Sequence, residues 1–225
     1  MFRKSLLASG ALALALLMAS SASAQFRGLK FPPAVTNIML LRNDAVKKEL
    51  DLKDDQLASL DEVATQMQSD ALEIFSGLQD LSPEEREKEM PNLMKMMNEK
   101  GKELQGKVDK ILDKKQVGRM KELSLQQRGA DALEDEEIAA ALKLTDDQKK
   151  ALVKVREDSA EKQNEIIKSL TEGGGDQGEI REKVGALRKE LNEKAMAVLT
   201  SAQKESFEKL KGAKFDLPKG RGFPF

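Results

Sequence analysis

The chain has 225 residues, of which 34% are charged and 4% are aromatic, and its formal net charge is −1. It contains no His and no Cys. These absences remove the usual general base near neutral pH, thiolate catalysis, disulfides and the commonest zinc and copper ligands. We therefore predict no catalytic residue, no bound metal ion and no cofactor. The slightly acidic balance argues against nucleic acid as a partner.

The first 24 residues have the pattern of an export signal. Arg3 and Lys4 form a basic start, an apolar run follows from Leu6 to Met18, and Ala22-Ser23-Ala24 is a small-residue cleavage site. The apolar run is shorter than the roughly 20 residues that a membrane-spanning helix needs. We expect cleavage after residue 24 and a mature chain of residues 25–225 that is periplasmic or otherwise exported.

The two ends of that mature chain, residues 25–37 and 216–225, are expected to be tails. Both contain phenylalanine together with Lys or Arg, and both contain proline or glycine. Basic-aromatic tails can engage a membrane surface or a partner protein. Their rings can equally pack back onto the rest of the protein while the ends fray. The residues favour neither interpretation.

Four segments share a leucine followed four residues later by a glutamine, at the start of a helix-like run. The pairs are Leu52 and Gln56, Leu112 and Gln116, Leu144 and Gln148, and Leu199 and Gln203. Thr145 and Thr200 complete Leu-Thr-x-x-Gln in the last two. A Thr cap and a Gln three residues later form a capping box, which contributes on the order of 1 kcal/mol. Asp113 can cap in the same way and Lys53 cannot. The pattern predicts helix starts rather than chemistry.

The chain also repeats itself. Residues 46–63 and 138–155 are identical at seven of 18 positions when compared at an offset of 92. The order of motifs is the same in both parts, so we predict a duplication with halves at 38–128 and 131–215. Each half reads as a short helix, two long helices and a short helix.

In the first half, apolar residues after Lys53 recur at alternating gaps of three and four, the stripe of an amphipathic helix. They are Leu57, Leu60, Ala64, Met67, Ala71, Ile74 and Leu78. Ser82, Pro83 and Glu85 then predict a capped helix start. Pro91 predicts a break or kink near Met90, because proline inside a helix costs about 3 kcal/mol.

The returning helix of the first half carries a second stripe. Its members are Met94, Met97, Leu104, Val108 and Ile111. Met94 and Met97 follow the stripe and are expected to fill the core. Met96 lies off it and is the better candidate for exposure, where its adaptable thioether suits varied protein partners.

The second half repeats the arrangement around a glycine-rich turn at 171–178. Its stripe residues are Leu152, Val155, Ile166, Leu170, Ile180, Val184, Leu187, Leu191 and Val198. No segment alternates like a strand. We predict an all-α fold of tandem helical hairpins, with long antiparallel helices and short capping helices. Stripes this narrow need a partner, so we expect either an intramolecular pseudo-dimer of the two halves or a homodimer.

The Leu-Thr-x-x-Gln motifs, the export signal and the charged helical hairpins resemble the Spy/CpxP-like family of LTxxQ-motif envelope proteins. The resemblance covers most of residues 38–215. It implies a thin, cradle-shaped, all-helical periplasmic protein that acts as an ATP-independent chaperone or as a damper of envelope-stress signalling. The chain departs from the pattern in two ways. It holds two hairpin units where family members usually have one, and it lacks the histidines through which some relatives bind zinc.

Two functions follow as expectations from the resemblance. The first is a holdase that binds unfolded or envelope proteins through a helical cradle. The second is a signalling or structural adaptor that docks to one specific envelope partner. An enzyme is the least supported class, because the usual catalytic residues are lacking. The sequence identifies no client-binding residue.

Overall fold

A computed structural model describes residues 33–78, 81–173 and 176–217. Within these ranges the chain is helical and has no β-strand, which confirms the predicted all-α class. The expected export signal, the remainder of the expected N-terminal tail up to residue 32, the glycines at 174–175 and residues 218–225 lie outside the described residues.

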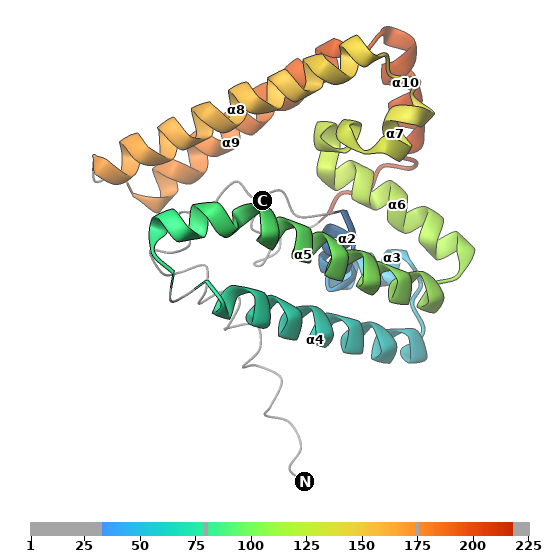
Figure 1. The fold of residues 1–225 in the computed structure, drawn as a ribbon. Coiled ribbons are helices and arrows are strands. Elements are labelled where there is room, and N and C mark those ends of the chain that lie inside the picture. Colours follow the sequence, from blue (N-terminus) through green and yellow to red (C-terminus); the bar gives the residue numbers. More distant parts are fainter. Residues whose placement is uncertain (1–32, 79–80, 174–175, 218–225) are drawn as a thin grey trace. The chain divides into compact units, whose positions relative to one another are not determined.

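The chain divides into two compact units (Figure 1). Among the described residues, the first unit holds 33–124 with 216–217, and the second holds 125–215. The sequence boundary falls between Ser124 and Leu125, inside helix α6 (Lys114–Arg128). The sequence repeat had placed the halves at 38–128 and 131–215.

The first unit is built on a pair of long helices. Its elements before α6 are α2 (Pro33–Leu41), α3 (Asp44–Glu49), α4 (Asp54–Ser76) and α5 (Pro83–Ile111). Helices α4 and α5 run antiparallel and pack along one another, and α2 packs against both (Figure 1). Residues 33–37, in the range expected as a tail, form the first turns of α2. They are helical because Ala34, Ile38 and Leu41 share one buried face.

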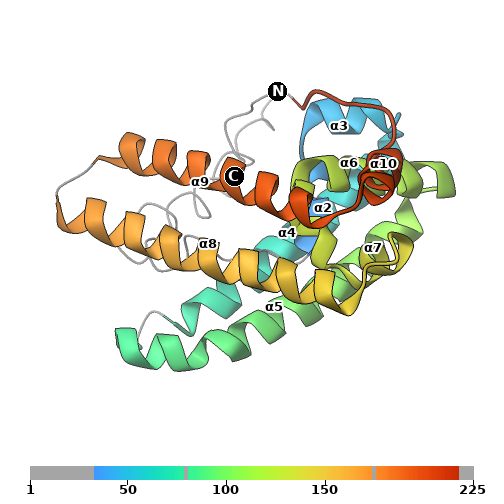
Figure 2. The ribbon, with the colours of Figure 1, turned by 90° about the horizontal axis from the view of Figure 1, so that it is seen from above.

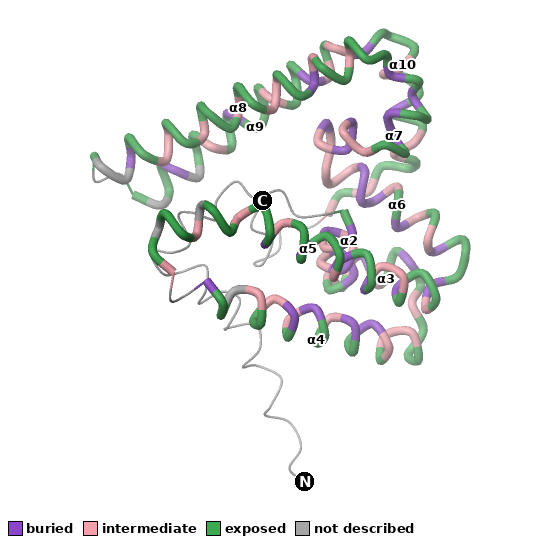
Figure 3. Tube along the Cα trace, viewed as in Figure 1, coloured by how far each residue is buried: buried purple, intermediate pink, exposed green. Residues whose placement is uncertain are grey.

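The buried face of α4 differs in part from the predicted stripe. Leu60 and Met67 are buried as expected, whereas Val63 and Asp70 lie on the same buried face and were not predicted. Leu57, Ala64, Ala71 and Ile74 are only half-buried. Figure 3 shows the buried and exposed positions on opposite sides of the helix. The carboxylate of Asp70 is satisfied there, because the Gln66 side-chain amide donates to it at 2.9 Å and Lys100 Nζ lies 3.5 Å away.

Helix α5 begins as the sequence predicts and does not break where a break was expected. Ser82 Oγ accepts a bond from the Glu85 N–H, and the Glu85 carboxylate accepts one from the Ser82 N–H, so the capping box is complete. The helix then runs without interruption through Pro91. A break near Met90 is therefore absent, whereas the bend of α5 in its first half (Figure 1) agrees with the alternative prediction of a kink. Pro91 itself is exposed, and Met90, Leu93 and Met94 around it pack into the apolar cluster at the tip of the hairpin.

The second unit begins with the end of α6. It continues through the 3₁₀ helix η2 (Gly129–Glu134), α7 (Glu136–Ala141), α8 (Asp146–Glu172), α9 (Gln177–Val198) and α10 (Ser201–Leu210). Helices α8 and α9 pack along one another as an antiparallel pair (Figures 1 and 2). The main apolar core lies at one end of this pair. It takes Leu152 and Val155 from α8 and Ala195 from α9, and its largest fully buried side chain is Phe207 of α10.

Both units end their short helix in the same unusual way. Asp51 follows α3 with φ 49° and Lys143 follows α7 with φ 53°, and these two positions are 92 residues apart. The next residue, Leu52 or Leu144, donates its N–H back across the turn at 3.1 and 2.9 Å. This is the Schellman arrangement, which normally favours glycine at the left-handed position. The shared conformation at the repeat offset supports the proposed duplication.

Candidate functional site

The glutamines of the repeated motif meet in pairs. In the first unit, Gln56 of α4 and Gln116 of α6 exchange two side-chain hydrogen bonds, at 2.7 and 3.0 Å. The Gln56 amide also donates to the Ile111 carbonyl at 2.9 Å, and the Gln116 amide donates to the Leu50 carbonyl at 3.1 Å. The motif therefore closes the unit by joining α4 to the start of α6.

The second unit contains the same arrangement. Gln148 of α8 and Gln203 of α10 exchange bonds of 2.7 and 3.0 Å. The Gln148 amide donates to the Val198 carbonyl at 3.0 Å, and the Gln203 amide donates to the Leu142 carbonyl at 3.2 Å. We call each of these reciprocal pairs a glutamine clasp. The sequence spacing predicted where each helix starts, but it did not predict that the glutamines would pair.

Each clasp glutamine also helps to cap its own helix. The side-chain oxygens of Gln148 and Gln203 accept from the N–H of Thr145 and Thr200, whose hydroxyls accept from the glutamine N–H groups. Both capping boxes are complete. Asp113 and Gln116 form the same two bonds at α6. At α4 the Lys53 N–H donates to Gln56, but a lysine side chain has no acceptor to return the bond.

The clasps have the properties of structural hydrogen-bond networks that hold helices together. A glutamine side chain can donate two hydrogen bonds and accept two, and every clasp glutamine uses all four. The motif leucines lie alongside, and Leu112, Leu144 and Leu199 are buried while Leu52 is half-buried. A fully satisfied polar network specifies one packing of the helices around it. Nothing in this arrangement offers a reactive group, and the amide groups of all four glutamines are used within their own units.

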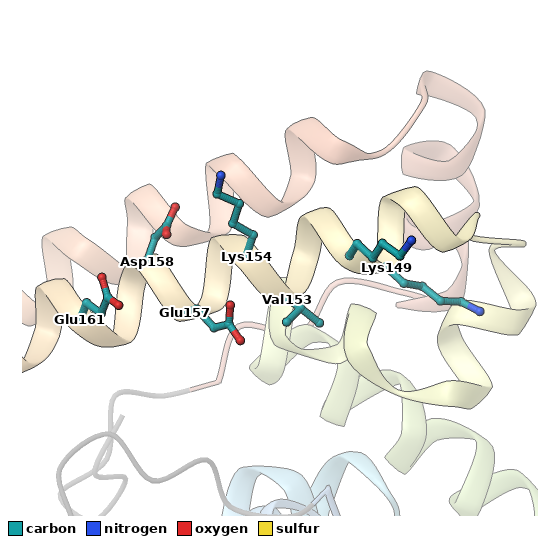
Figure 4. A pocket seen from close by; sticks show the side chains of 7 residues that line it. Lys149, Val153, Lys154, Glu157, Asp158 and Glu161 are labelled. Carbon is teal, nitrogen blue, oxygen red and sulfur yellow. The ribbon is translucent and has the colours of Figure 1, made fainter.

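The long helices of the second unit carry an exposed face that no clasp uses. A shallow, open depression follows one side of α8 (Figure 4). We call its lining the α8 face, which consists of Lys149, Lys150, Val153, Lys154, Glu157, Asp158 and Glu161. Figure 4 shows Val153 and Glu157 along one edge of the helix, and Lys154 and Asp158 along the other. Val153 is 37% exposed, which is high for a large apolar side chain.

The charges of the α8 face are sorted by sign. Its three lysines lie in the first three turns of the helix and its three acids lie in the next two turns. Lys149 reaches Asp146 at 3.6 Å, with both side chains largely in solvent. Exposed pairs of this kind contribute little to stability. The face therefore presents a positive block, which includes the exposed Val153 between Lys150 and Lys154, followed by a negative block.

Beyond the core, α8 and α9 form a thin arm. The described members of the core cluster end at Val155 on α8 and begin again at Ala195 on α9. Residues 156–172 of α8 extend past that point by about 25 Å, at 1.5 Å per residue. In this arm only three apolar side chains are buried, and four are half-covered. The first group is Leu170, Ile180 and Leu187, and the second is Ile166, Ile167, Val184 and Leu191.

Ion pairs lie on the surface of both units. In the arm, Glu190 lies 2.6 Å from Lys194 and 3.0 Å from Lys162. Hydrogen bonds from Lys194 and then Lys162 lower the pKa of Glu190, and the same contact raises the pKa of Lys194. In the first unit, partial burial alone would lower the pKa of Arg119. Its hydrogen bonds to Glu122 and Glu49 outweigh that burial and raise it.

The described residues offer little to other kinds of ligand. Across 33–78, 81–173 and 176–217, no cluster of three or more His, Cys, Asp or Glu side chains could hold a metal ion. In the same ranges, no helix combines the length and the apolar character needed to cross a membrane. Comparison with known proteins adds no assignment, since no family model, no curated protein and no solved structure matches the chain.

Proposed function

We propose that this chain is an exported, ATP-independent holdase that binds unfolded proteins along its long helices. The observation that carries the proposal is the α8 face, where the exposed Val153 has Lys149 and Lys150 about one turn before it and Glu157 about one turn after it. The proposal agrees with the resemblance to the Spy/CpxP-like family. Membership of that family is part of the proposal, as is the periplasmic location.

The physical basis is the breadth of contacts that such a surface permits. An unfolded chain presents apolar side chains and charges of both signs in no fixed order. A shallow surface that combines an exposed apolar side chain with charges of both signs can contact many such sequences weakly. Its shape is not complementary to any single sequence.

The long helices of the first unit add exposed apolar side chains of the same kind. Leu72 on α4 is 42% exposed and Met96 on α5 is 46% exposed, as its position off the stripe predicts. The contact between Asp70 and Lys100 fixes the register of the two antiparallel helices. In that register, Leu72 and Met96 lie within about one turn of the same level. We propose that each unit supplies one client-binding surface and that one chain acts as a pseudo-dimer.

The proposal is tested by the aggregation of a chemically denatured client after dilution, with and without residues 25–225, in the absence of ATP. Suppression of aggregation near equal molar amounts, for two unrelated clients, is the expected result. Suppression of neither client would refute the holdase. A search for one tightly bound envelope partner, as the adaptor hypothesis requires, would then follow.

A matched pair of variants locates the binding surface. Val153→Gln removes the exposed apolar side chain of the α8 face, and Ala186→Gln makes the same kind of change at an exposed position of α9. Burial of an exposed valine contributes at most about 1 kcal/mol, so we expect client affinity to fall by up to about five-fold in the first variant only. Equal affinity of the two variants would remove the α8 face from the proposal.

The charge blocks are tested in the same way. Reversal of Lys149, Lys150 and Lys154 to glutamate makes the whole α8 face negative. Reversal of Lys114, Lys115 and Lys121, which are exposed on α6, changes the net charge by the same amount. We expect the first set to weaken the binding of acidic clients more strongly than the second. Equal effects would show that only net charge matters.

A further inference from the structure

A small apolar cluster at the tip of the first hairpin is unusually rich in methionine. Its buried members are Leu78, Leu93 and Met97, and the partly buried Ile74, Leu81, Met90 and Met94 pack against them. Three of these seven side chains are thioethers. Met96 lies next to them in the sequence and is 46% exposed. Four of the ten methionines of the chain thus fall within residues 90–97.

We propose that this tip cluster is a site of methionine oxidation, and that sulfoxide formation unpacks the tip of the α4–α5 hairpin while the second unit stays folded. This inference does not rest on the holdase function. The oxidant class is a hydroperoxide, with hydrogen peroxide as the simplest member. The thioether sulfur attacks one peroxide oxygen and the O–O bond breaks. With hydrogen peroxide, that oxygen stays on the sulfur and its proton passes to the departing hydroxide, which leaves as water. The sulfur loses two electrons and the peroxide gains them.

The sulfurs are accessible in a graded order. Oxidation of methionine follows the exposure of the side chain, so Met96 reacts first. Met90 and Met94 are half-buried and follow, and Met97 is 8% exposed and comes last. Oxidation of Met96 alone adds a polar group where water already reaches it. Oxidation of Met90 and Met94 places a polar oxygen against Leu78 and Leu93, which supply no hydrogen-bond donor from their side chains.

The tip of the α4–α5 hairpin has few stabilising contacts. Oxidation of one or two methionines is therefore enough to unpack it. Among the side chains that the structure describes, its cluster has three buried members and is separate from the rest of the core. The helix that carries the methionines also contains Pro91, which removes one backbone hydrogen bond two turns from the helix start. A two-helix hairpin has little stability of its own without an apolar seam. Loss of the seam therefore frees the start of α5.

The second unit provides an internal control in the same chain. The seam of its α8–α9 arm is filled by Leu170, Ile180 and Leu187, together with half-buried Ile and Val side chains. No methionine occurs between residues 156 and 195. Aliphatic side chains do not react with peroxide under conditions that oxidise thioethers. The two hairpins share an architecture and differ in the one chemical property that the proposal needs.

The test is hydrogen exchange of residues 25–225 as peroxide is titrated, with peptide mass spectrometry reporting which methionines carry oxygen. We expect exchange in residues 83–97 to rise at least about ten-fold once Met90 and Met94 are oxidised, while residues 177–191 keep their protection. Reduction by the two methionine sulfoxide reductases, one for each sulfoxide epimer, is expected to restore protection. Unchanged exchange in residues 83–97 of the oxidised chain would overturn the proposal.

Two variants separate modification from unpacking. Replacement of Met90, Met94 and Met97 by leucine keeps the volume of the seam and removes its sulfurs, so peroxide should no longer raise exchange at the tip. Met96→Leu removes the most exposed sulfur and leaves the seam, so the tip should still open. A tip that opens equally in the triple leucine variant would show that oxidation acts elsewhere, which contradicts the proposal.

Discussion

Removal of Gln116 tests whether the glutamine clasp stabilises the first unit. In the variant Gln116→Ala, four side-chain hydrogen bonds are lost, two to Gln56, one to the Leu50 carbonyl and one from the Asp113 N–H. Each such bond contributes about 0.5–1.5 kcal/mol net. Gln116 is only 7% exposed, so water replaces few of these bonds. We expect the free energy of unfolding to fall by about 3 kcal/mol.

The matched variant in the second unit sets the scale. Gln203→Ala also removes four bonds, but Gln203 is half-exposed and water reaches its partners more readily. We expect a loss of about 1.5 kcal/mol. Urea unfolding measures each loss, and hydrogen exchange assigns it to a unit. A loss for Gln116→Ala no larger than that for Gln203→Ala would refute the argument from burial.

A double-mutant cycle isolates the pair itself. Gln56→Ala and Gln116→Ala remove the same two mutual bonds, so their effects should not add. We expect a coupling energy of at least about 1 kcal/mol. Coupling below about 0.3 kcal/mol would mean that the two side chains act independently, and the clasp would then be no more than two separate helix caps.

Three further predictions concern the helix ends. Lys53→Thr supplies the cap acceptor that α4 lacks and should stabilise the first unit by about 0.5–1 kcal/mol in urea unfolding, and no gain would refute this explanation. Lys143→Gly relieves a side chain at φ 53° and should add about 1 kcal/mol in thermal unfolding, where a loss would contradict the strain argument. Hydrogen bonds from the Ser82 side chain and backbone lower the pKa of Glu85. The stability it contributes is therefore present above the unfolded pKa and lost as pH falls through the folded pKa. NMR titration of that carboxyl should show the low pKa and a rise in Ser82→Ala, and an unchanged pKa would exclude the Ser82 hydroxyl as a cause.

The helix starts could be predicted from the sequence because capping is local. Thr145, Thr200 and Ser82 each bond to a residue three positions away, within the reach of a short motif. The pairing of the glutamines is different in kind. Gln56 and Gln116 are 60 residues apart and Gln148 and Gln203 are 55 apart, so their contact depends on the packing of whole helices.

Other differences have equally specific causes. Asp70 occupies a buried position of α4 that a stripe of apolar residues does not reveal, because its partner Lys100 comes from the facing helix. Pro91 predicted a break or a kink from the cost of an isolated proline, and α5 bends but continues, because the residues on both sides of Pro91 pack against Leu78 and its neighbours. The α8 face could not be predicted from the sequence, because its charged residues resemble those of any exposed helix. Its exposure emerges only when the side of α8 that faces α9 is known.

The measurement that tests the central claim most directly is photo-crosslinking of an unfolded client to defined positions of α8 and α9. A photoreactive phenylalanine derivative is placed at position 153 in one protein and at position 186 in another, both exposed in the second unit. The client is diluted from denaturant without ATP, and the irradiated products are analysed by mass spectrometry. The account predicts strong crosslinks from position 153 and few from position 186, for two unrelated clients. Crosslinks of equal yield at both positions, or none at position 153, would contradict it.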